Sequence, residues 1–62
     1  MKDEMGLTEA LTIAAACGRG DARRFSIDQM KQAAARLERA NVSACREDVV
    51  EELLRRGVPL QS

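Results

Sequence analysis

The residues in this chain that could do chemistry are two cysteines, Cys17 and Cys45, and a few hydroxyl side chains. The 62-residue sequence contains no histidine, so no serine or cysteine nucleophile can be paired with a histidine base. A Cys₂His₂ zinc site is excluded for the same reason, and two cysteines alone cannot close a structural zinc site. We therefore expect no catalytic residues, no metal and no cofactor, and a protein that is not an enzyme.

Two short stretches have the outline of ligand-binding loops but lack the residues that such loops need. Residues 18–21, GRGD, lack the glycine–lysine spacing and the preceding strand of a phosphate-binding loop. If Ile27 is aligned with the apolar position of a calcium-binding loop, Gly20 and Lys31 fall where the first and last carboxylate ligands belong. The sequence thus predicts neither a nucleotide site nor a calcium site.

The clearest structural element is a helix predicted over residues 26–40. Ser26 is a favourable N-cap, and Gln29, three residues later, completes a capping box. Phe25 and Met30 have the spacing of a hydrophobic staple. Asn41, just after the helix, can adopt the left-handed conformation with little strain. The apolar residues recur at spacings of three and four, as expected for one core-facing side: Ile27, Met30, Ala33, Ala34 and Leu37.

An earlier helix is predicted over residues 8–17, because apolar residues recur there at the same spacings. We expect Gly18 to end this helix in the left-handed conformation that glycine adopts at a C-terminal cap. The expected apolar face has Ile13 only at its edge and consists of Leu7, Ala10, Leu11, Ala14 and either Cys17 or Gly18.

The third predicted helix covers residues 45–56, with Ser43 as a candidate N-cap. Gly57, followed two positions later by Pro59, is expected to end it, and Val58 and Leu60 to fold back onto the core. The helix carries a broad apolar face formed by Val49, Val50, Leu53 and Leu54. This face is wider than one neighbouring helix covers. Either both other helices pack on it, or part of it forms a dimer or partner surface, and Val50 and Leu54 are the candidates for self-association as a homodimer.

These elements predict an all-α fold, a small three-helix domain that occupies residues 1–62, with residues 1–6 disordered. A chain of this length buries only about 60% of the surface that it exposes when unfolded, so its core is thin and oligomerisation is a reasonable expectation. No stretch approaches the ~20 apolar residues that span a membrane, and no secretory signal precedes the first helix. We expect a cytoplasmic protein with no membrane partner.

The charges are balanced overall but not along the chain. Ten basic and ten acidic residues give a net charge of zero, yet residues 19–46 hold seven basic residues against three acidic ones, a net charge of +4. A net charge of zero is not typical of a dedicated nucleic-acid-binding protein. The basic segment nevertheless supplies the candidate partner-binding residues, which we expect on a basic face: Arg23, Arg24, Lys31, Arg36, Arg39 and Arg46.

Two hypotheses for function follow, and both involve macromolecular binding. In the first, the protein binds and blocks another protein. In size and composition the chain is similar to small stand-alone regulators of bacteria, phages and plasmids, such as antitoxins and anti-CRISPR proteins. In the alternative, a dimer binds DNA through a helix–turn–helix-like pair formed by the second and third helices. The start of the third helix would then face the bases and phosphates, and its acidic residues would weaken that contact: Glu47, Asp48, Glu51 and Glu52.

Overall fold

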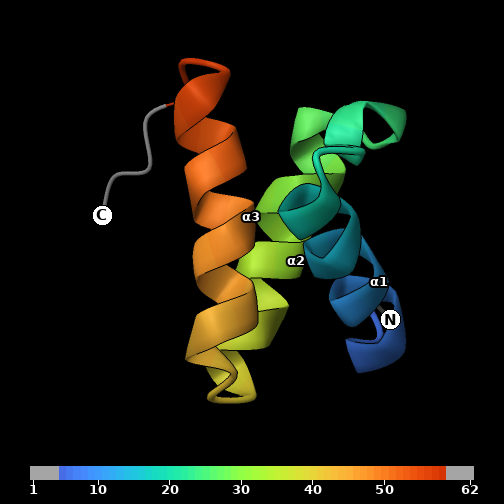
Figure 1. Ribbon diagram of the computed structural model, residues 1–62. Coiled ribbons are helices and arrows are strands. Elements are labelled where there is room, and N and C mark those ends of the chain that lie inside the picture. Colours follow the sequence, from blue (N-terminus) through green and yellow to red (C-terminus); the bar gives the residue numbers. More distant parts are fainter. Residues whose placement is uncertain (1–4, 59–62) are drawn as a thin grey trace.

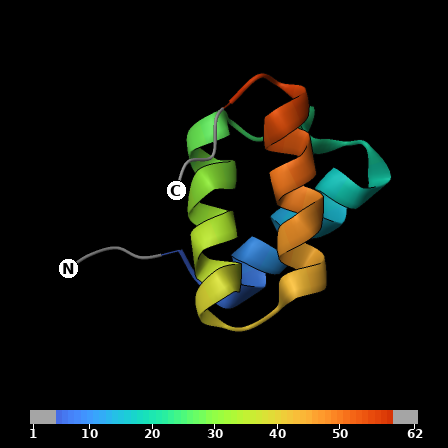
Figure 2. The same ribbon diagram turned by 90° about the vertical axis from the view of Figure 1, so that its left-hand side faces the viewer.

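A computed structural model describes residues 5–58 of the chain. Its elements are α1 (Leu7–Arg19), a short 3-10 helix η1 (Ala22–Arg24), α2 (Ile27–Arg39) and α3 (Ser43–Arg55). Helices α2 and α3 run side by side in opposite directions, and α1 packs across one side of both (Figures 1 and 2). No strand occurs in the described part, so the predicted all-α, three-helix architecture is confirmed.

The start of α2 follows the local sequence signals closely. The Gln29 backbone N–H donates to the Ser26 hydroxyl at 3.1 Å, and the Ser26 N–H donates to the Gln29 side-chain oxygen at 2.8 Å, so the predicted capping box is confirmed. Phe25, just before the cap, is half-buried and packs against the core. At the other end Asn41 has a φ of 62°, the left-handed conformation expected for it.

The end of α1 differs from the prediction. Gly18 was expected to be the left-handed residue, but α1 continues to Arg19 and the left-handed residue is Gly20, with a φ of 80°. The Gly20 N–H donates to the Cys17 carbonyl, and the Asp21 N–H donates to the Ala16 carbonyl at 2.8 Å. Gly18 instead lies where α1 approaches α3, because a Cβ added there would be 3.3 Å from the Asp48 carboxylate.

The buried side of α1 is rotated relative to the predicted one. Ile13, expected at the edge, is fully buried, whereas Leu11, expected on the apolar face, is 38% exposed. The reason is that α1 contacts α2 and α3 together, so a broad side centred between Ala10, Ile13 and Cys17 is covered and Leu11 falls outside it. On α2, Ile27 was also expected in the core and is 39% exposed.

Helix α3 begins at Ser43, two residues earlier than predicted. Val42 occupies the N-cap position without a side-chain cap, so the prediction of Ser43 as the cap was wrong. Gly57 has a φ of 79°, which confirms it as the residue that ends the helix. Val58 packs against the core as expected, while Pro59 and Leu60 lie outside the described residues.

The predicted disorder of residues 1–6 concerns mainly residues 1–4, which lie outside the described part. Of the other two, Met5 packs against the core and Gly6 occupies the N-cap position of α1. Each of α1, α2 and α3 has 13 residues. Within residues 5–58, no helix has both the length and the apolar character that crossing a membrane requires.

The adjacent leucines of α3 give a direct test of this packing. Leu53 is fully buried and Leu54 is 56% exposed. We expect Leu53→Ala to lower the free energy of unfolding by about 2–5 kcal/mol, because it leaves a cavity between three helices. Leu54→Ala is the matched control and should cost less than about 1 kcal/mol. Urea unfolding followed by circular dichroism measures both, and equal losses would contradict the described core.

Candidate interaction surfaces

The six predicted basic residues are distributed over different parts of the surface. Arg23 and Arg24 lie on η1, at the end of the molecule that also holds the start of α2 and the end of α3 (Figure 1). Arg39 and Arg46 lie near the turn between α2 and α3, at the opposite end. Residues 19–46 are therefore basic in composition, but the fold does not gather all six side chains on one face.

On η1, the arginines are exposed and one of them is held by its neighbours. The Arg24 guanidinium lies 3.5 Å from the Asp21 carboxylate and 5.9 Å from the centre of the Phe25 ring, within range of a cation–π contact. These contacts are local and stabilise the lead-in to α2. Arg23, next to it, is exposed to solvent.

The last turns of α2 bring two arginines together. Arg36 and Arg39, three residues apart, line a shallow depression of about 160 Å³. Met5 also lines it, and the remaining lining residues, Gln32 and Ala35, belong to α2. This depression combines guanidinium groups with an apolar side chain, and both kinds of residue are enriched where proteins bind one another.

The two remaining basic candidates, Arg46 and Lys31, lie on α3 and α2, respectively. The Arg46 Nε lies 3.7 Å from a carboxylate oxygen of Glu38, so the pair links α3 to α2 as an ion pair that is too long for a hydrogen bond. Lys31 is exposed on α2. The two candidates for self-association lie on α3 after Arg46, with Val50 half-buried and Leu54 exposed.

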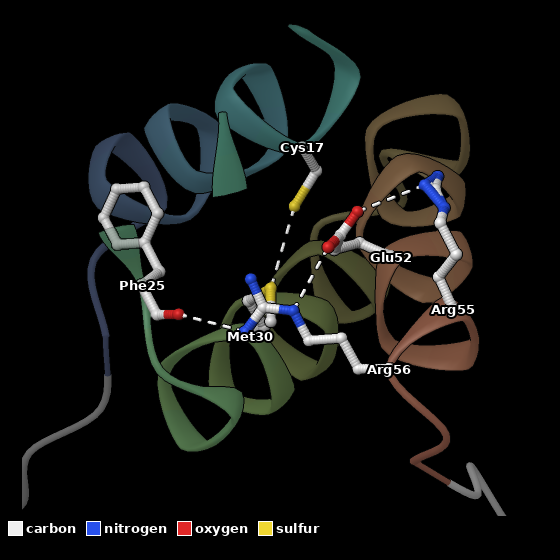
Figure 3. Close-up of polar contacts among 6 residues, drawn as sticks. All are labelled: Cys17, Phe25, Met30, Glu52, Arg55 and Arg56. Atoms are coloured by element: carbon white, nitrogen blue, oxygen red, sulfur yellow. Dashed lines mark hydrogen bonds and ion pairs between the residues drawn. The ribbon is translucent and has the colours of Figure 1, made fainter. Parts of the chain in front are cut away.

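A cluster of polar contacts around Glu52 was not anticipated from the sequence. Glu52 of α3 accepts hydrogen bonds from Arg55 at 3.2 Å and from Arg56 at 3.1 Å. Arg56 also donates to the Phe25 carbonyl at 3.3 Å, which ties the end of α3 to the residue before the α2 cap (Figure 3). The spacings of three and four residues from Glu52 could have indicated the first two contacts, but the third depends on the tertiary fold.

The same region contains the buried cysteine. The Cys17 thiol points toward Met30 of α2, with 3.9 Å between the two sulfur atoms (Figure 3). Burial raises the pKa of the Cys17 thiol, and the nearby Glu52 carboxylate raises it further. The thiolate is the reactive form of cysteine, so this environment keeps Cys17 protonated and unreactive. Cys45, half-buried on α3, is also unpaired.

Most of the polar side chains of the described residues are exposed or half-buried. Within residues 5–58 no polar or charged side chain is buried, and no three or more Cys, Asp or Glu residues are grouped as metal ligands. Most charged groups lie at the surface, but the Glu52 side chain is only 15% exposed and the Nε atom of Arg46 is buried. The chain matches no known protein-family model, no curated protein and no solved structure.

The contacts of Glu52 predict different roles for the two arginines bound to it. Arg56→Met removes an ion pair and the hydrogen bond to the Phe25 carbonyl, so we expect a loss of about 1 kcal/mol in the free energy of unfolding. Arg55 is 59% exposed, and Arg55→Met should cost less than about 0.5 kcal/mol. Chemical unfolding of the two variants measures both losses. A larger loss in Arg55→Met than in Arg56→Met would contradict these roles.

The two cysteines should also react at different rates. We expect iodoacetamide to modify Cys45 at least about tenfold faster than Cys17 in the folded protein, because Cys17 is buried and its pKa is raised. Mass spectrometry of timed samples measures both sites. Unfolding in urea is the control and should make the two rates similar, whereas equal rates in the folded protein would contradict the described environment.

Proposed function

We propose that this protein has no catalytic activity and acts by binding another protein, which it blocks or regulates. The observation that carries the proposal is the depression formed by Met5, Ala35, Arg36 and Arg39. The apolar lining residues beside two guanidinium groups suit a partner segment that carries an apolar side chain next to acidic ones. Arginine can bind such carboxylates with two parallel hydrogen bonds, which adds geometric specificity to the charge attraction.

The distribution of polar groups supports binding over catalysis. Catalytic acids and bases usually have pKa values perturbed by burial or by a close charge. Burial raises the pKa of the Cys17 thiol, which makes this thiol less reactive. The two unpaired thiols also support our proposal that the protein works in the reducing cytoplasm.

DNA binding is the second candidate, and one observation favours it. The turn between α2 and α3 consists of residues 40–42, a length typical of helix–turn–helix motifs. Against it, the first turns of α3 present exposed acids at the position of a recognition helix: Glu47, Asp48 and Glu51. Carboxylates there would repel DNA phosphates, so we rank this function below protein binding.

The first test compares two double variants in a pull-down from host lysate. The tagged wild-type protein should retain one protein at fixed stoichiometry. R36E/R39E should weaken that complex at least about tenfold, because interface arginines frequently contribute more than 1 kcal/mol each. R23E/R24E is the matched control, with the same charge change on η1, and should bind normally. If R36E/R39E retained the partner as well as the wild type does, the proposed surface would be wrong.

Fluorescence anisotropy with generic duplex DNA separates the two candidates. We expect no binding even at the lowest point of a salt series from about 50 to 200 mM. An affinity that falls by several hundred-fold across that series would indicate multiple phosphate contacts and would favour the DNA-binding function.

A further inference from the structure

The depression beside the last turns of α2, which we call the arginine depression, concentrates positive charge. Its two guanidinium groups come from positions three residues apart, which are neighbours on the surface of a helix, and like charges on neighbouring positions repel. No acid occurs among the described lining residues, so an anionic group beside the apolar ones would relieve this repulsion. These lining residues are Met5, Gln32, Ala35, Arg36 and Arg39.

Met5 determines where the preceding part of the chain is attached. This residue packs against the hydrophobic core and also lines the arginine depression. Gly6, the next residue, is the N-cap of α1 and has an extended backbone with φ −72° and ψ 156°. Its carbonyl accepts a hydrogen bond from the Ala10 N–H at 3.0 Å. The chain is therefore held at the start of α1, with Met5 beside the two arginines.

The two residues directly before Met5 are acidic. They are Asp3 and Glu4, whereas Lys2 is one position farther from the depression along the chain. Consecutive Cα atoms are about 3.8 Å apart, so covalent geometry keeps the Cα atoms of both acids within about 8 Å of the Met5 Cα. Two carboxylates are thus tethered next to two guanidinium groups of opposite charge.

The acids of α2 itself have other contacts. Asp28 accepts a hydrogen bond from the Gln32 side chain at 3.3 Å. Glu38 lies beside Arg46 of α3, with 3.7 Å between the carboxylate oxygen and Nε. A group attached by a short linker has an effective concentration on the order of millimolar. Among the acids of the chain, the pair before Met5 is therefore the best placed to reach the depression.

We propose that Asp3 and Glu4 occupy the arginine depression in the free protein, with their carboxylates bound to Arg36 and Arg39. The regulatory consequence rests on the proposed function. A protein partner that uses the same two guanidinium groups must first displace the chain's own carboxylates. The acidic pair is therefore an internal competitor, which lowers the affinity for the partner and favours partners that bury more apolar surface on Met5 and Ala35.

The expected strength of this contact allows displacement. An ion pair between exposed side chains changes an equilibrium constant by a factor of about 1.4–5, so two pairs together give a factor of about 2–25. The apparent affinity of a partner is reduced by the fraction of molecules in which its site is open. A depression that is covered in about two-thirds of the molecules lowers this affinity about threefold.

Arginine modification of the full chain tests the contact without any partner. Phenylglyoxal reacts with accessible guanidinium groups, and mass spectrometry of timed samples gives the rate at each arginine. We expect D3N/E4Q to raise the rates at Arg36 and Arg39 about threefold, because the depression is then open in nearly all molecules. The rate at Arg23 on η1 should not change. Wild-type rates at Arg36 and Arg39 in D3N/E4Q would overturn the proposal.

The matched control for this experiment is E47Q/E51Q. It removes two exposed acids of α3 and changes the net charge of the protein by the same amount. The rates at Arg36 and Arg39 should equal those of the wild type. An increase as large as that in D3N/E4Q would mean that net charge, and not a contact by Asp3 and Glu4, controls the reactivity, and would also overturn the proposal.

Partner affinity tests the competition and separates the two proposals. A protein retained by the wild-type chain in the pull-down should bind D3N/E4Q about threefold more tightly and E47Q/E51Q with unchanged affinity. Equal or weaker binding to D3N/E4Q would overturn the internal competitor, since Asp3 and Glu4 would then be neutral or would contact the partner themselves. If no protein is retained, the proposed function fails, while the phenylglyoxal rates still decide whether the acidic pair occupies the depression.

Discussion

Close approach of α1 to the α2–α3 hairpin is the constraint on which the rest of the structure depends. Five large side chains are fully buried in the described residues, so small residues must let the helices meet: Ala10, Ala14, Ala33 and Gly18. A side chain that ends at Cβ reduces the distance between helix axes and brings dispersion contacts into range. The core is therefore stabilised by close contacts between helices more than by large side chains.

A thin core leaves the ends of the hairpin to be held by polar contacts. At one end, Arg56 connects Glu52 to the carbonyl that precedes the α2 cap. At the other, Arg46 lies beside Glu38 next to the turn. The first contact is partly shielded from water, because the Glu52 side chain is only 15% exposed, so it should be the stronger of the two. These two contacts fix which residues of α2 lie opposite which residues of α3.

The sequence predicted best those features that a few neighbouring residues determine. The Ser26–Gln29 capping box and the left-handed Asn41 are local, and both were predicted correctly. The rotation of α1 was predicted incorrectly, because Ile13 and Leu11 are equally apolar and only the position of the two neighbouring helices decides which is buried. Likewise, composition showed a basic segment, but the separation of its arginines depends on the tertiary fold.

The period of an α-helix separates the arginines of the depression from the side of α2 that contacts α3. Arg36 and Arg39 lie on the side next to Met5, whereas Glu38 lies beside Arg46 of α3. The packing of α2 against α3 therefore leaves the two guanidinium groups of the depression at the surface of the molecule.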